Sequence, residues 1–192
     1  MSREKILQAI RQNKPALNPH PALPEFERDA AAAVPSFMEA VGKSGGKSHL
    51  LKDGETVTEI VQRHYPEAAR IISRTTDSQL GNVDLDQLEK LTDLHGLDLA
   101  ILPAQLGVAE NAAVWLTEAE MGQRVVPFIA EHLVLVLDRK DVVSDMHQAY
   151  KRIEIDEPGF GLFIAGPSKT ADIEQSLVIG AQGPRTWLVI LV

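Results

Sequence analysis

The sequence predicts an α/β domain built on a mostly parallel sheet with helices on both faces, preceded by an N-terminal helical arm. Strand-like and helical segments alternate along most of the chain, as is typical of parallel sheets. Several of the strand-like segments, such as Leu133–Leu137, are aliphatic without interruption, which indicates strands buried on both faces. The length of 192 residues suits one domain, and a hydrophobic fraction of 44% is sufficient for a core.

The first expected element is a helix over residues 2–13. Ser2 can cap its N-terminus, and Ile6, Leu7 and Ile10 form one apolar stripe. Four prolines follow between residues 15 and 24, and each disfavours helix in the residue before it. We therefore expect residues 1–24 to form a helical arm with a proline-rich connector, and residues 25–192 to form the α/β domain.

The remaining elements follow from hydrophobic periodicity. Apolar residues three and four apart, such as Val57, Ile60 and Val61, predict helices, and short aliphatic runs predict strands. A helix is expected over about 35–41, ended by glycines. After it come strand 48–51, helix 55–64, strand 69–72, helix 85–91, strands 97–102 and 112–116, helix 125–131, strand 133–137, an amphipathic segment 142–151, strand 162–165, helix 170–179 and strand 188–192.

Charge and hydropathy exclude several classes of partner. The net charge is −8 and no basic run is present, so we expect no nucleic-acid partner, because binding a phosphate backbone needs clustered Lys and Arg. The longest apolar runs, such as Trp187–Val192, are too short for a membrane span. No apolar stretch near residue 1 is long enough for a signal peptide, so we expect a cytoplasmic protein.

The sequence contains no cysteine. This excludes disulfides, a cysteine nucleophile and an all-cysteine iron–sulfur cluster within these residues. The six histidines show no close-paired spacing, so we expect no metal site. We expect no cofactor in this chain, and any electrons in its reaction would travel through another molecule.

The turn Gly166–Thr170 is the first candidate ligand site. It consists of Gly166, Pro167, Ser168, Lys169 and Thr170, between a strand and a predicted helix. If the strand is parallel, free backbone N–H groups at the helix start would form an anion site at its carboxyl end. Ser168 or Thr170 can cap the helix, while Lys169 can supply a charge for a carboxylate or phosphate. The alternative interpretation is a capped helix without a ligand.

Two further segments are candidates. In Gly180–Pro184, Gln182 and Gly183 could contact a ligand held by the first turn, although a helix C-cap followed by a connecting turn explains the glycines equally. Glu110 lies among small and apolar residues, where a carboxylate would need a partner and could have a perturbed pKa. The alternative is an exposed residue at the start of a strand.

The run Gly166–Glu174 resembles the C-terminal signature G-P-S-[RK]-T-A-D-I-E of the LutC/YkgG (LUD-domain) family, and it stands complete here. Gly180–Pro184 is similar to the family's G-x-H-G-P turn, and Val108–Asn111 to its A-E-[TS] segment. The likeness extends over about residues 97–192. Gln182 stands where the family often has His, which argues against proton transfer there. Asn111 and Ala112 replace the usual Thr/Ser-Gly.

The resemblance implies a NagB/RpiA/CoA-transferase-like α/β fold. It also implies a role in oxidising L-lactate to pyruvate, together with partner proteins that carry iron–sulfur clusters. This chain would be the cluster-free subunit and would bind a small carboxylate or phosphate at the signature turn. The site residues that follow are Gly166, Pro167, Ser168, Lys169, Thr170, Asp172, Gln182 and Gly183.

Two alternatives belong to other classes of function. The chain could be a freestanding small-molecule enzyme, because relatives with the implied fold act as CoA-transferases, sugar-phosphate isomerases and folate cyclo-ligases. Glu110 would then be the catalytic nucleophile or base. It could also be a non-catalytic interaction module that uses helix 2–13 to dock a partner or a second copy.

Overall fold

A computed structural model describes residues 2–15, 18, 21, 30–154, 159–171 and 177–192. Its centre is a five-stranded sheet in the order β1-β11-β6-β3-β2, with every neighbouring pair parallel. The strands are β1 (Lys47–Leu50), β11 (Thr186–Leu191), β6 (His132–Leu137), β3 (Leu99–Ala104) and β2 (Ile71–Ser73). The predicted α/β fold with a mostly parallel sheet is confirmed, and the amino ends of all five strands lie at one edge.

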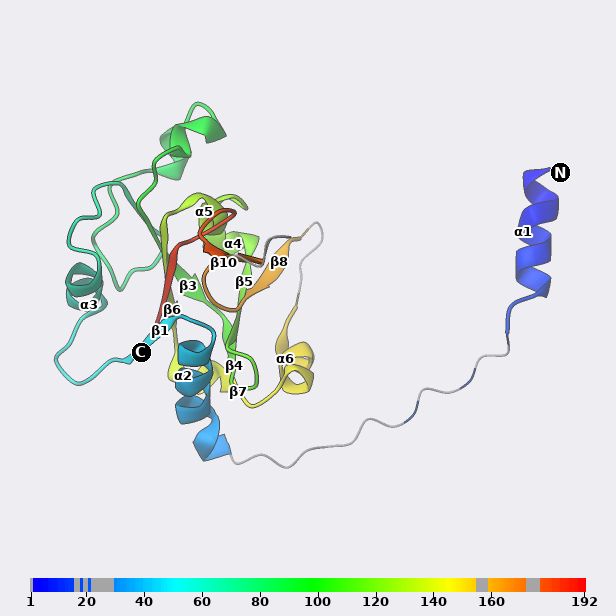
Figure 1. Ribbon diagram of the computed structural model, residues 1–192, viewed down its shortest axis with the longest axis horizontal. Helices are drawn as coiled ribbons and strands as arrows, with labels where there is room; N and C mark the ends of the chain where they lie inside the picture. The colour runs from blue at the N-terminus through cyan, green and yellow to red at the C-terminus, as the bar shows by residue number, and fades with distance from the viewer. Residues whose placement is uncertain (1, 16–17, 19–20, 22–29, 155–158, 172–176) are drawn as a thin grey trace.

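Alternation of side chains along the central strands divides the core into two layers. In β6, Leu133 and Leu135 pack in one buried cluster, while Val134 and Val136 pack in another. The side chains on both faces of β6 are aliphatic because both faces of the sheet are covered. Figure 1 shows α3 (Val57–His64) on one side of this sheet and a second sheet on the other.

A second, four-stranded sheet lies over the first core layer together with α2 (Ala33–Lys43). Its order is β7-β4-β5-β8, with β7 (Val142–Val143), β4 (Leu106–Val108), β5 (Ala113–Thr117) and β8 (Gly161–Ile164). Strand β8 pairs antiparallel with β5. The strand predicted at 162–165 therefore exists, but it does not belong to the parallel sheet.

Helix α3 covers the opposite face. Val57, Ile60 and Val61 are buried against the central strands, as their spacing predicted. A capping box begins the helix, in which the Thr56 hydroxyl accepts from the Glu59 N–H and the Glu59 carboxylate accepts from the Thr56 N–H. The helix ends with His64 and Tyr65 at the amino edge of the sheet, which places both residues beside the cavity described below.

The remaining elements are short. Helix α1 (Arg3–Gln12) is capped by Ser2 and buries none of its residues. In the described residues no helix is both long and apolar enough to cross a membrane. The other elements are η1 (Ala30–Ala32), η2 (Leu85–Gln87), η3 (Leu91–Leu94), α4 (Glu118–Met121), α5 (Val126–Ile129), η4 (Arg139–Asp141), α6 (Met146–Arg152), β9 (Lys169–Ala171) and β10 (Leu177–Ile179).

Two predicted helices were wrong, and a third segment holds two elements. The helix expected over 170–179 is replaced in the described residues by strands β9 and β10, which pair antiparallel. The β-branched residues Thr170, Val178 and Ile179 favour this extended form. Segment 85–91 forms two short 3₁₀ turns that continue to residue 94. Segment 142–151 divides into β7 and α6, because Asp145 caps a new helix at Met146.

Candidate functional site

The two glycine-containing turns that the sequence singled out lie against each other. The Ser168 N–H donates to the Pro184 carbonyl at 2.9 Å, and the Gly180 N–H donates to the Ser168 carbonyl at 3.0 Å. The Gln182 N–H lies 3.4 Å from the Ser168 hydroxyl oxygen. Ser168 thus joins the turns and does not cap a helix. Segments 166–170 and 180–184 form one unit, which we call the paired turns.

The paired turns also contact the C-terminal end of α2. The Lys169 ammonium donates to the Ser44 carbonyl, where it satisfies an acceptor that the helix itself leaves open. Gly166 has φ +102°, and a Cβ there would lie 2.9 Å from the same carbonyl oxygen. Glycine is therefore required at position 166 both by backbone conformation and by the close approach of α2.

The expected helix N-terminus does not form among the described residues of this region. Thr170 lies in β9, where it pairs with Val178, and Pro167 is buried. Asp172 lies outside the described residues. The carboxyl end of β8 belongs to the second sheet, so the rule for ligands at the carboxyl edge of a parallel sheet does not apply there.

Gln182 and Gly183 line an open groove of about 540 Å³. Phe128 and Ile129 of α5 form its apolar side, and Arg185 and Glu131 stand at its border. The Arg185 guanidinium donates to the Glu131 carboxylate at 2.6 Å. This ion pair also borders a second cavity, so it separates the two spaces.

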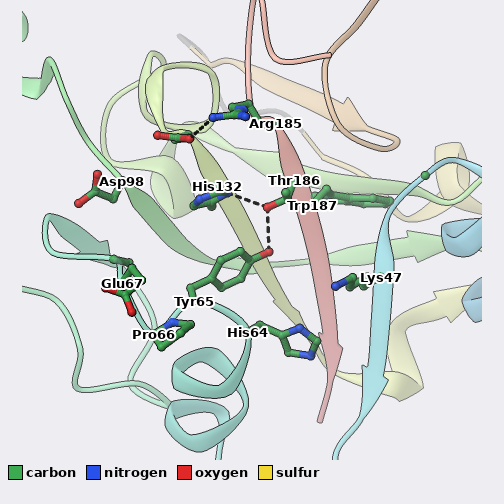
Figure 2. A pocket seen from close by; sticks show the side chains of 13 residues that line it. Lys47, His64, Tyr65, Pro66, Glu67, Asp98, His132, Arg185, Thr186 and Trp187 are labelled. Carbon is green, nitrogen blue, oxygen red and sulfur yellow. Dashed lines mark hydrogen bonds and ion pairs between the residues drawn. The ribbon is translucent and has the colours of Figure 1, made fainter. Parts of the chain in front are cut away.

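The second cavity has a volume of about 500 Å³ and lies at the amino edge of the central sheet (Figure 2). It is surrounded by the ends of elements: His64 and Tyr65 finish α3, His132 begins β6 and Thr186 begins β11. We call it the amino-edge cavity. The sequence did not point to it, because no short motif contains these residues and only the parallel pairing of β6 with β11 brings His132 beside Thr186.

Three side chains form a hydrogen-bonded chain in this cavity. His132 Nδ1 lies 2.8 Å from Thr186 Oγ1, which in turn lies 3.1 Å from the Tyr65 hydroxyl oxygen. The rings of Tyr65 and His132 are 4.9 Å apart and inclined by 30°. Figure 2 shows the three groups facing one another across the ends of α3, β6 and β11.

Burial shifts the pKa of both rings of this hydrogen-bonded chain in the direction that favours the neutral form. Desolvation raises the pKa of Tyr65, and the hydrogen bond with Thr186 lowers it in part. Desolvation is also the largest effect on His132 and lowers its pKa, while Glu131 raises it, Arg185 lowers it and Asp98 raises it. Near neutral pH the phenol therefore keeps its proton and the imidazole stays uncharged.

Glu110 lies elsewhere, in the turn between β4 and β5. Its carboxylate accepts from the Met146 N–H at 3.1 Å and so satisfies a donor at the start of α6. The Asn111 side chain accepts from the Ala113 N–H at 3.0 Å, and Ala112 has φ +61°. These contacts give the segment a role in shaping the turn, while catalysis by Glu110 stays a prediction.

A model of the LUD domain matches residues 34–192. The chain belongs to the LUD-domain family. The LutC/YkgG resemblance is thereby confirmed, and the match includes the paired turns, α3 and the whole central sheet.

Curated relatives agree with this family. "Lactate utilization protein C" from Geobacillus sp. (strain WCH70) is 24% identical over 98% of this chain and 79% of its own length. The protein of the same name from Geobacillus kaustophilus is 29% identical over 87% of this chain and 71% of its own length.

Among solved structures, a DUF162 family protein from Deinococcus radiodurans matches with a TM-score of 0.61. It is 16% identical and covers 86% of this chain and 99% of its own. This likeness supports the α/β fold of the LUD domain.

Proposed function

We propose that this LUD-domain chain acts in lactate utilisation as the subunit without an iron–sulfur cluster, alongside partner proteins that carry the clusters during oxidation of L-lactate to pyruvate. The observation that carries the proposal is the match along nearly the whole chain to proteins named for lactate utilisation. The absence of cysteine from all 192 residues supports the division of labour, since an all-cysteine cluster needs another chain.

The paired turns are the proposed contact for a small carboxylate or phosphate. Lys169 is exposed and reaches the Ser44 carbonyl with one of its three N–H donors. The exposed Gln182 side chain borders the adjacent groove. The anion would be held by this side-chain charge and amide, because the described residues offer no helix N-terminus at this place.

The role is tested by deleting the gene in its native host and measuring growth on L-lactate and lactate-dependent dye reduction. We expect both to fall, and complementation with the wild-type chain to restore them. Affinity capture of the tagged protein from lactate-grown cells should recover cysteine-rich proteins containing iron. Unchanged growth and dye reduction in the deletion strain would reject the proposal.

The anion contact is tested by complementation with Lys169→Gln, using Lys151→Gln on α6 as a matched control with equal loss of charge. We expect Lys169→Gln to reduce lactate-dependent dye reduction by several-fold at unchanged protein level, while Lys151→Gln behaves as wild type. Equal activity of the two variants would remove Lys169 from the site.

A further inference from the structure

The hydrogen-bonded side chains of Tyr65, Thr186 and His132 in the amino-edge cavity lie outside the paired turns and have no part in the function proposed above. Thr186 has a single hydroxyl proton, so it can donate to only one of its two neighbours and must accept from the other. Two arrangements satisfy all the contacts. They differ in which group offers a donor to the cavity and which offers an acceptor.

In the first arrangement, His132 Nδ1–H donates to Thr186, Thr186 donates to Tyr65, and the phenol proton is free for a ligand. The second ring nitrogen of His132 is then an acceptor. In the other arrangement, Tyr65 donates to Thr186, Thr186 donates to Nδ1, and His132 presents an N–H while Tyr65 presents a lone pair. A shift of three protons thus exchanges donor and acceptor without moving a heavy atom.

Such a pair can satisfy either a hydroxyl or a carbonyl oxygen at the same position. A ligand hydroxyl both donates and accepts, whereas a ligand carbonyl only accepts. Because both rings are neutral near pH 7, neither arrangement needs a change of net charge. The hydrogen-bonded groups Tyr65, Thr186 and His132 can therefore bind a ligand oxygen in either form, as an alcohol or as a ketone.

One end of the cavity carries positive charge. Lys47 and His64 line it from β1 and α3, and Figure 2 shows both on the side of Tyr65 away from Glu67. In the described part of the chain, no hydrogen bond or ion pair engages the Lys47 ammonium. Desolvation and then the charge of Lys47 lower the pKa of His64, so Lys47 supplies the positive charge at this end.

Two of the three carboxylates that line the cavity are engaged, and the third, on Glu67, lies on the side of Tyr65 away from Lys47. Asp98 accepts from the N–H groups of Ala69 and Arg70 at 2.9 and 2.8 Å, and Glu131 is paired with Arg185. Their charges are therefore partly compensated within the fold. The positive end remains open to an anionic ligand.

We propose that the amino-edge cavity binds a small hydroxy or oxo carboxylic acid, with its carboxylate at Lys47 and the neighbouring oxygen at Tyr65 and His132. The volume of about 500 Å³ lies in the range of small-molecule sites and exceeds the needs of a three-carbon acid. This site is separate from the paired turns, so it does not depend on whether they bind an anion.

Calorimetric titration of the purified full-length chain with L-lactate, pyruvate, propionate and inorganic phosphate tests the proposal. Propionate has the carboxylate but lacks the hydroxyl or keto oxygen next to it. Phosphate is an anion with neither a carboxylate nor such a neighbouring oxygen. We expect L-lactate and pyruvate to bind at least about fivefold more tightly than propionate, as one net hydrogen bond provides. Phosphate should bind no more tightly than propionate.

Matched variants locate the binding. Tyr65→Phe removes only the hydroxyl, and Tyr150→Phe is its control, because Tyr150 is 65% exposed on α6. Lys47→Gln is paired with Lys151→Gln. We expect Tyr65→Phe to weaken the binding of L-lactate and pyruvate about fivefold and to leave the binding of propionate unchanged. Lys47→Gln should weaken the binding of all three acids. Both controls should match the wild type.

Four results would overturn the proposal, and the first three concern the acids and the variants. They are absence of saturable binding of either acid, equal affinity for propionate and lactate, and cavity variants that behave as their controls. Preferential binding of phosphate would also overturn it and indicate a phosphate site. Failure of the lactate-growth experiment would leave these measurements unaffected, so the two proposals can fail separately.

Discussion

At the scale of single residues, the paired turns depend on backbone positions that only glycine fills easily. Gly166 lies in the left-handed region and against a helix carbonyl, which combines two constraints. Gly54 has a similar φ of +84°, but a Cβ at that position would meet no atom within 4 Å. A substitution at Gly54 therefore tests conformational strain alone, whereas the same substitution at Gly166 adds a steric contact.

Gly166→Ala should destabilise the protein by more than Gly54→Ala does. Both variants force an alanine into the left-handed region, which costs about 1–2 kcal/mol. Gly166→Ala also places a methyl group against the Ser44 carbonyl, where something must shift. Thermal unfolding of both variants measures the difference, and equal losses would show that α2 moves aside without cost.

At the scale of elements, α3 connects local sequence to the amino-edge cavity. Its apolar stripe fixes one face on the sheet, and its capping box fixes where it begins. Its length then brings Tyr65 to the amino edge, opposite Thr186. The position of the phenol is thus decided by the helix start at Thr56.

Thr56→Ala should lower the free energy of unfolding by about 1 kcal/mol, since it leaves the Glu59 N–H without its hydroxyl acceptor. Thr56→Ser keeps that acceptor and should stay close to the wild type. Denaturant unfolding of the three proteins measures the effect. A loss in Thr56→Ser as large as in Thr56→Ala would assign it to the threonine methyl group and not to the cap.

At the scale of the whole molecule, stability resides in the buried clusters on the two faces of the central sheet and in a third that includes residues of the second sheet and α6. Helix α1 contributes no buried residue, and Ile6, Leu7 and Ile10 remain exposed on it. The first 24 residues include four basic and one acidic residue, whereas the chain as a whole has a net charge of −8. The first 24 residues therefore differ from the whole chain in the sign of their charge, and α1 stays outside the core.

Removal of residues 1–24 should leave the unfolding temperature within about 2 °C of the full-length value, because α1 buries none of its residues. If the arm docks a partner or a second copy, the same truncation should abolish that assembly, as measured by light scattering or affinity capture. A large drop in unfolding temperature at low protein concentration would instead show that α1 packs on its own domain.

The sequence by itself determined the fold class and most strands, because uninterrupted aliphatic runs such as Leu133–Leu137 are typical of strands in a sheet that is covered on both faces. The family signature also identified the segments that become the paired turns. Tertiary structure decided that segment 170–179 contains strands, since the paired strands satisfy each other's backbone groups. It also decided that Tyr65, Thr186 and His132 meet. Local sequence carries no information on such contacts, because Tyr65 and Thr186 are 121 positions apart in the chain and His132 and Thr186 meet only through the pairing of β6 with β11.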